Sequence, residues 1–169
     1  MDRILDKARD DQNILERIAN KIPGFKGYRE KELRRDADRL QREHLAAQLE
    51  ECKKALNEIS ATLSRSGDLG PINDVETARK RLDKVINRIR YADRGYAGFF
   101  GAIKVREEEL AHVYEFDMSL LGGVEAIRAA SNQAAGAGDA AAGVRAMVGA
   151  IDEVDAKLAQ RESILNGIS

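Results

Sequence analysis

The apolar residues between positions 75 and 92 recur at alternating spacings of three and four. They are Val75, Ala78, Leu82, Val85, Ile89 and Ala92. This heptad spacing puts all six on one face of an α-helix and is typical of helices that pack along their length. The chain also has 34% charged residues, only 5% aromatic residues and two prolines, as helix-rich proteins do. We therefore predict an all-α fold, an elongated up-and-down antiparallel bundle of four to five long helices with coiled-coil-like packing.

Turn-forming residues divide the chain into helices. Breaks are expected at Pro23 with its flanking glycines, at residues 64–71, at Gly95–Gly101 and at residues 136–139. Within a single domain, residues 1–169, we expect a short N-terminal helix at 2–21, a linker at 22–28, and long helices over about 28–64, 73–94, 102–135 and 139–166. Asn73 or Asp74 is the predicted N-cap of the third of these helices, and an Asp N-cap is expected at 139.

The other predicted helices also carry apolar seams. The seam residues are Leu45, Leu49, Cys52, Leu56, Ile59 and Leu63, then Leu110, Val113, Leu120, Val124 and Ile127, then Val144, Met147, Ile151, Val154, Leu158 and Leu165. Alanine and glycine are dense between residues 126 and 150, which predicts two helices in close approach. Cys52 is the single cysteine, so the chain forms no internal disulfide, and we read Cys52 as a small buried hydrophobe.

Basic and aromatic residues gather in two stretches that an up-and-down topology places at the same end of the bundle. Residues 79–106 contain nine Lys or Arg against two Asp or Glu, whereas residues 107–169 contain four against eleven. Six of the eight aromatic residues also belong to this end, which we name the basic aromatic pole: Phe25, Tyr28, Tyr91, Tyr96, Phe99 and Phe100. Its candidate partner- or anion-binding residues are Lys26, Tyr28, Arg29, Arg34, Arg35, Arg88, Arg90, Arg94, Tyr96, Phe99, Phe100 and Lys104. The alternative is that the aromatic residues fill the space between diverging helix ends and the charges are solvated.

Charged residues at seam positions are the other unusual feature. Asp117 and Arg161 interrupt apolar seams, and a buried charge requires a partner, so we expect a structural ion pair. The alternative is that Asp117 is a catalytic carboxylate beside His44. We place Asp117 about 20 Å from the pole, near the height of His44 and of residues 79–81, and take Asp117 and His44 as buried polar candidates. Glu109 and His112 form one Glu-x-x-His pair, but the second pair that a di-metal bundle needs is missing, so no metal or cofactor is predicted.

Function is predicted only as a class. The charged residues form no complete catalytic constellation, so the first hypothesis is a non-enzymatic interaction or scaffold protein, self-associating, whose pole binds an acidic protein. A nucleic-acid-binding module is the alternative; there Arg29, Lys31, Arg34, Arg35, Arg88, Arg90 and Arg94 contact phosphates while Tyr96 or Phe99 stacks. A third interpretation is peripheral membrane binding through residues 95–106. No small-molecule substrate is indicated.

The sequence also bears on localisation. The first twelve residues lack the basic start and apolar stretch of a signal peptide, and no segment has the roughly 20 apolar residues that a bilayer-spanning helix needs. A single cysteine suits a reducing compartment. We therefore expect a cytoplasmic protein.

Overall fold

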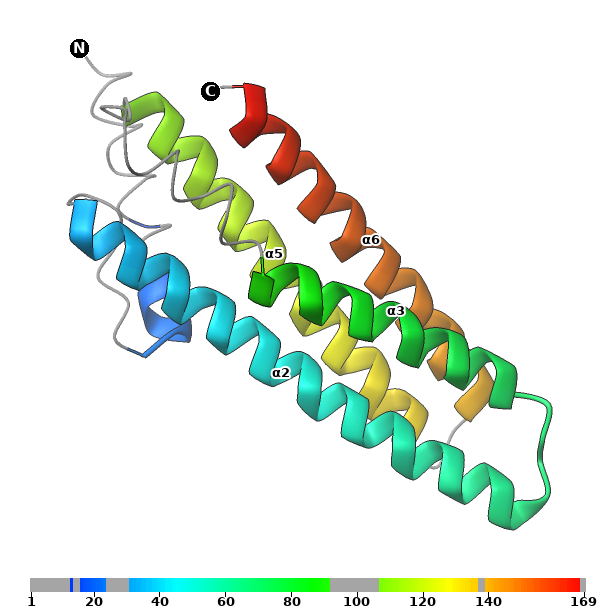
Figure 1. Cartoon of the computed structure of the whole chain (residues 1–169). Helices are drawn as coiled ribbons and strands as arrows, with labels where there is room; N and C mark the ends of the chain where they lie inside the picture. The colour runs from blue at the N-terminus through cyan, green and yellow to red at the C-terminus, as the bar shows by residue number, and fades with distance from the viewer. Residues whose placement is uncertain (1–12, 14–15, 24–30, 92–106, 137–138, 168–169) are drawn as a thin grey trace.

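The structure is a bundle of long helices (Figure 1). The computed structural model describes residues 13, 16–23, 31–91, 107–136 and 139–167. Within this part, every regular element is helical, which confirms the predicted all-α bundle. The long helices are α2 (Lys31–Ser66), α3 (Ile72–Tyr91), α5 (Glu107–Ala135) and α6 (Ala140–Gly167). Residues 16–21 form a shorter helical segment.

The turn between α2 and α3 shows why α2 ends at Ser66. Gly67 has a φ of 75°, a left-handed conformation that costs glycine little. Its N–H donates to the Ser64 carbonyl at 3.4 Å, and the Asp68 N–H donates to the Leu63 carbonyl at 3.1 Å, the two bonds of a Schellman motif. The predicted N-cap at Asn73 or Asp74 is wrong, because α3 already begins at Ile72 and the Pro71 carbonyl accepts the Val75 N–H at 3.0 Å.

The predicted N-cap of α6 is correct. The Asp139 carboxylate Oδ1 accepts the Ala142 backbone N–H at 3.1 Å, which satisfies one of the free donors in the first turn. The negative charge of Asp139 also lies at the positive end of the helix dipole.

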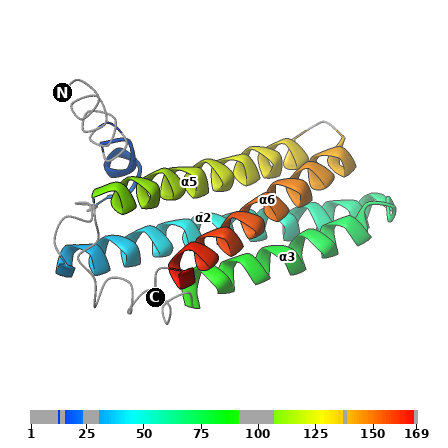
Figure 2. The same ribbon diagram turned by 90° about the horizontal axis from the view of Figure 1, so that it is seen from above.

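Two antiparallel hairpins, α2–α3 and α5–α6, lie side by side (Figures 1 and 2). The main contacts between the described helices are α2 with α3, α3 with α6, α6 with α5, and α5 with α2. The charged residues of α3 pair with residues of α6 at a nearly constant separation in the sequence. Arg81 and Asp152 are 71 residues apart. The interval is also 71 residues for Lys84 with Asp155. The neighbours α3 and α6 therefore run parallel, and α3 and α5 lie across the bundle from each other.

The core follows the predicted seams. Every seam residue whose side chain the structure describes is buried. These residues are Leu45, Leu49, Cys52, Leu56, Ile59, Leu63, Val75, Ala78, Leu82, Val85, Ile89, Leu120, Val124, Ile127, Val144, Met147, Ile151, Val154 and Leu158. They form one continuous apolar cluster with Ile18 and Ile22. Burial of apolar side chains at about 25 cal/mol per Å² is the main force that holds such a bundle together.

The two helices α5 and α6 approach closely, as the small residues predict. A Cβ placed on Gly143 would lie 2.6 Å from the Ala134 Cα. A Cβ on Gly123 would lie 2.6 Å from the Val154 Cγ2. Glycine at these two positions therefore allows the helices to pack backbone against side chain. Gly122 and Gly123 both lie within an unbroken helix.

Helix α3 has 20 residues and is shorter than the 36-residue α2. Figure 1 shows α3 ending while α2, α5 and α6 continue in the same direction. None of the described helices is both long and apolar enough to cross a lipid bilayer.

Candidate functional site

Most residues of the basic aromatic pole lie outside the described part of the chain. These are Lys26, Tyr28, Arg29, Arg94, Tyr96, Phe99, Phe100 and Lys104. Arg34 and Arg35 lie on α2, where the structure describes the backbone but not these two side chains. Arg88 and Arg90 are described in full and lie in the last turn of α3. The geometry of the pole is therefore built from the end of α3 and its neighbours.

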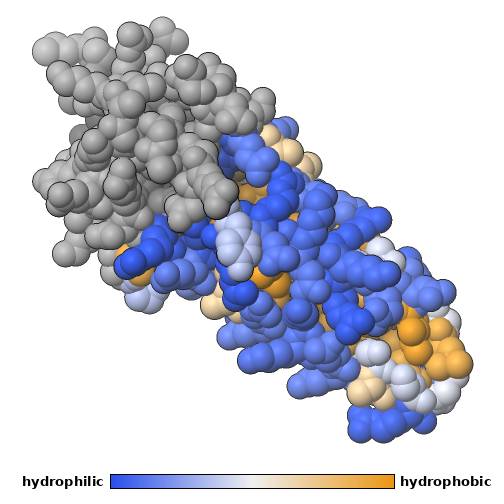
Figure 3. All heavy atoms as spheres, in the orientation of Figure 1, coloured by the Kyte–Doolittle hydropathy of each residue, from blue (hydrophilic) through white to orange (hydrophobic). Residues whose placement is uncertain are grey.

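Tyr91, the last residue of α3, has an exposed side chain. Its relative exposure is 76%, the higher of the two exposed large hydrophobic residues in the described part of the chain. The other is Leu69, with 65% exposure, in the turn at the opposite end of the bundle. Figure 3 shows apolar side chains gathered at that opposite end and a mostly hydrophilic surface between. Of the aromatic residues assigned to the pole, Tyr91 is the one that the structure describes, and it does not fill a gap between helices.

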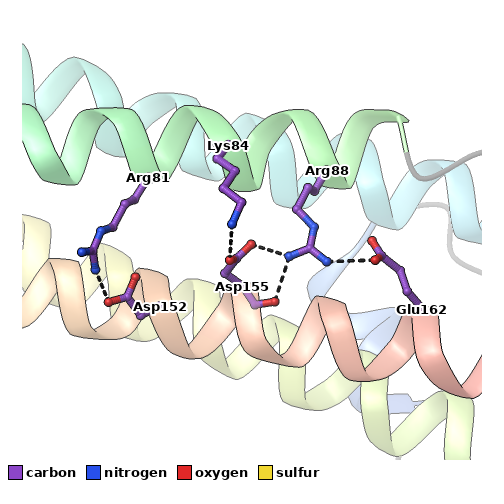
Figure 4. A network of polar contacts seen from close by, with 6 residues as sticks. All are labelled: Arg81, Lys84, Arg88, Asp152, Asp155 and Glu162. Carbon is purple, nitrogen blue, oxygen red and sulfur yellow. Dashed lines mark hydrogen bonds and ion pairs between the residues drawn. The ribbon is translucent and has the colours of Figure 1, made fainter.

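The basic row of α3 faces carboxylates of α6 (Figure 4). Arg81 pairs with Asp152, and the Lys84 Nζ donates to Asp155 Oδ2 at 2.7 Å. Arg145 on α6 and Asp74 on α3 make the reverse pair at 3.9 Å, with the same interval along the chain. The charge excess that the sequence shows on α3 is thus largely balanced by α6 inside the same molecule.

Arg88 is the most engaged member of this row. Its guanidinium donates to the Asp155 carboxylate, to the Asp155 backbone carbonyl at 3.0 Å, and to Glu162 Oε2 at 3.0 Å. Burial acts to lower the pKa of Arg88, but the hydrogen bonds with Asp155 and Glu162 outweigh it and raise the pKa. Burial likewise acts to raise the pKa of Asp155, but the hydrogen bonds from Lys84 and Arg88 outweigh it and lower the pKa. Both shifts favour the charged pair.

Arg90 faces α2, the helix that forms a hairpin with α3. Its Nη1 lies 3.1 Å from Glu50 Oε1, and its backbone carbonyl accepts a hydrogen bond from Arg42 Nη1 at 3.2 Å. The Arg90 carbonyl lies in the last turn of α3, so Arg42 contacts the C-terminal end of that helix. This contact places Arg42 at the height where α3 ends.

A buried ion pair joins α5 and α6 at nearly the same height. Asp117 is fully buried, with 0% exposure, and Arg161 is 8% exposed. The Arg161 Nη2 donates to Asp117 Oδ1 at 3.0 Å, which gives each charge the partner that the sequence demanded. Arg161 precedes Glu162, and Glu162 pairs with Arg88, so the ion pair lies beside the last turn of α3.

The expected height of Asp117 is wrong with respect to residues 79–81. Arg81 pairs with Asp152, which precedes Arg161 by nine residues, or roughly 13 Å along α6. The error arose because counting residues gives distance along one helix but not the offset between two helices. His44 is only half-buried, and its charged neighbour is Arg128 on α5, eleven residues after Asp117.

The interface between α2 and α5 holds two further titratable groups. Burial, followed by the positive charge of Arg128, lowers the pKa of His44. Burial raises the pKa of the Cys52 thiol to about 11, although Arg128 and a hydrogen bond with Ser131 act in the opposite direction. Cys52 is a free, buried thiol, as predicted. Among the residues that the structure describes, no three His, Cys, Asp or Glu side chains gather in a way that could hold a metal ion.

No protein-family model matches this chain. No curated protein and no solved structure matches it either. The site is therefore interpreted from its own geometry.

Sequence reasoning missed the pairing of α3 with α6. The signal was present, because Arg81 and Lys84 are three residues apart and so are Asp152 and Asp155, with a further basic residue at 88 and a further acidic residue at 162. Matching rows of opposite charge on two helices predict a parallel pair in that alignment. The sequence pattern instead led us to predict one basic end of the bundle, with the acidic residues elsewhere.

Proposed function

We propose that this chain is a non-enzymatic helical interaction protein that self-associates and contacts an acidic partner through the basic aromatic pole. The exposure of Tyr91 carries the proposal. A large aromatic side chain left in water at the end of a helix loses the gain of burial, and such residues are enriched in protein interfaces. The competing explanation, in which the aromatic residues only fill space between helix ends, does not account for Tyr91.

The charges around Tyr91 narrow the partner's chemistry. Arg88 and Arg90 are each paired with carboxylates of the same chain, so they contribute little free positive charge. Arg39 on α2 is exposed, and its Nε lies 3.8 Å from Glu43 Oε1, so its side chain is more available to a partner than those of Arg88 and Arg90. Residues 21–42 contain eight Lys or Arg against four Asp or Glu, and one of the eight, Lys21, pairs with Glu125. The remaining excess of positive charge, with Arg39, supports an acidic partner that docks against the first half of α2.

The nucleic-acid alternative has less support. It depends on Arg88 and Arg90 as phosphate contacts, and both would first have to leave Asp155, Glu162 and Glu50. Phosphate binding by a partly neutralised surface is weak, because the electrostatic term comes from unpaired cations that release counterions.

Sedimentation velocity over a wide concentration range tests self-association, and Tyr91→Ala tests the surface. We expect the wild-type chain to associate as concentration rises and Tyr91→Ala to weaken the association by at least tenfold, about 1.4 kcal/mol. Leu69→Ala is the matched control, because it removes an exposed apolar side chain from the opposite end of the bundle. A strictly monomeric wild-type chain removes self-association. Equal effects of the two variants remove Tyr91 as a contact.

Fluorescence anisotropy with two polyanions separates the two partner classes. We expect poly-L-glutamate to bind at low ionic strength and a single-stranded DNA oligonucleotide of equal charge to bind more weakly. Tighter DNA binding with a steep loss of affinity in salt would favour the nucleic-acid alternative.

A further inference from the structure

Residues 16–22 pack against the bundle in a different way from the four long helices, and we name them the strap. Figure 2 shows the helical part of the strap standing at a steep angle to the long helices. Ile18 and Ile22 are buried, whereas the other residues of the strap are exposed or, at Lys21, half-buried. The two isoleucines are four residues apart, so they lie on one side of a single helical turn. The strap is therefore attached to the bundle through one narrow apolar face.

The strap lies on the side of the bundle where α5 meets α2, which we name the α2–α5 face. Lys21 forms an ion pair with Glu125 of α5, and Figures 1 and 2 show the strap on the side of α5 that is turned away from α6. The other main neighbour of α5 is α2. Ile18 and Ile22 belong to the same continuous apolar cluster as the seams of α2 and α5. The α2–α5 face is therefore apolar where the isoleucines enter it and carries a carboxylate beside them.

The attachment of the strap is weak in comparison with that of a long helix. Burial of two isoleucines stabilises the closed position, but ordering the backbone of seven residues opposes it with conformational entropy of similar size. The ion pair adds little, because the Lys21 and Glu125 side chains are 35% and 51% exposed. Helix α2, by contrast, buries all six of its seam residues. The strap can therefore open while the four long helices remain folded.

We infer that the strap opens independently of the bundle and that the α2–α5 face is a binding surface for an amphipathic helix of a partner protein. The seated strap shows which chemistry the face accepts. It presents two aliphatic side chains four residues apart and, one position before the second, a basic side chain that reaches Glu125. A partner helix with this pattern competes with the strap for the same position. Tyr91 lies on α3, so this surface is separate from the contact proposed there, and either can fail without the other.

Native-state hydrogen exchange tests the opening of the strap in the full chain. The Ile22 N–H donates to the Ile18 carbonyl at 3.0 Å, so its exchange reports on the strap, whereas the Leu49 amide within α2 reports on the bundle. Local opening exposes little surface, so we expect urea below the unfolding transition to leave the exchange rate of the Ile22 amide nearly unchanged. The Leu49 amide should exchange faster as urea rises. If both amides depend on urea in the same way, the strap opens only with the bundle, which overturns the inference.

A peptide added in trans tests the binding surface. Ile18→Ser with Ile22→Ser releases the strap, and Arg17→Ser with Asn20→Ser is the matched control, because it changes two exposed residues of the same segment. The probe is a fluorescein-labelled peptide with the sequence of residues 13–23, and its binding is followed by fluorescence anisotropy. We expect it to bind the released variant about tenfold or more tightly than it binds the wild type and the control. The same peptide with serine in place of Ile18 and Ile22 should not bind.

Three outcomes of these measurements contradict the inference. Equal affinity of the probe for all three chains, or no binding to the released variant, overturns the binding surface. Loss of helical circular dichroism in the released variant would show that the strap and the bundle fold as one unit, which overturns independent opening. Wild-type self-association that the released variant abolishes would assign the face to the strap of a second copy and overturn a partner helix as its occupant.

Discussion

Gly143 is the position where α5 and α6 come closest, and Gly143→Ala measures how close. The added Cβ would lie 2.6 Å from the Ala134 Cα, 2.7 Å from its Cβ and 2.7 Å from its backbone N. Real Cβ atoms do not approach other atoms below about 3.0 Å. The obstacle is backbone, which cannot rotate away, so the two helices must separate or shift. Overpacking of this kind costs about 1–3 kcal/mol, and a backbone obstacle puts the cost at the upper end.

Gly149→Ala is the matched control on the same helix. Nothing lies within 4 Å of a Cβ at Gly149, and the residue is exposed. Both substitutions gain about 1 kcal/mol of helix propensity, so the difference between them isolates the steric cost. We expect Gly149→Ala to raise the free energy of unfolding by about 1 kcal/mol and Gly143→Ala to lower it by about 2 kcal/mol.

Urea unfolding followed by far-UV circular dichroism gives both values, and thermal unfolding checks them. A gap of about 3 kcal/mol corresponds to roughly 6–12 °C in Tm for a chain of this size. If the two variants are equally stable, the close packing of Gly143 on Ala134 is wrong. A drop in Gly149→Ala as well would show that the outer face of α6 is covered.

The remaining predictions concern buried and titratable groups. Asp117→Leu should cost about 3–5 kcal/mol in the free energy of unfolding because it removes a carboxylate partner of the buried Arg161 charge, whereas the double variant Asp117→Leu with Arg161→Met should recover most of this loss. Urea unfolding of the wild type, Asp117→Leu, Arg161→Met and the double variant closes the cycle, and additive losses would contradict the pair. The lowered pKa of His44 means that the unfolded chain binds this proton more readily, so stability should be complete above the usual pKa of 6.5 and fall as pH drops below it. Thermal unfolding between pH 8 and pH 5, with His44→Gln as control, measures that loss, and an unchanged slope in the variant would assign it elsewhere. Cys52, with its pKa raised to about 11, should resist alkylation at neutral pH until the bundle opens, so labelling in rising urea should follow the unfolding curve and not precede it.

The core of this bundle could be predicted from sequence because helix periodicity is local. The seam of α3 needed only the spacing of Val75, Leu82 and Ile89 to identify the buried face. The N-cap at Asp139 could also be predicted from local sequence. An Asp just before an alanine-rich helical run accepts a hydrogen bond from a backbone N–H in the first turn. The predicted N-cap at Asn73 is wrong because the helix begins before it. The first intrahelical hydrogen bond runs from the Val75 N–H to the Pro71 carbonyl, so Pro71 is the N-cap residue, two residues before Asn73.

The arrangement of the helices around the core could not be predicted in the same way. Periodicity states which face of α3 is buried but not which helix covers it. An up-and-down path allows α3 to neighbour α5 or α6, and the choice of α6 follows from charge rows that are 71 residues apart. The heights of Asp117 and residues 79–81 were misjudged together, because both depended on that choice.

The contact between α3 and α6 also changes how the charge pattern of the sequence should be interpreted for binding. Arg81, Lys84 and Arg88 look like an exposed basic face in sequence, yet each one meets a carboxylate of α6. Helix α3 ends at Tyr91, and Arg42 marks that height on α2, so α2 extends from there back to Lys31 beyond the reach of the paired rows. These three residues of α3 are therefore already paired, and the proposed acidic partner is expected at the basic residues of the first half of α2. A partner that used Arg81, Lys84 or Arg88 would have to compete with the α6 carboxylates that already pair with these side chains.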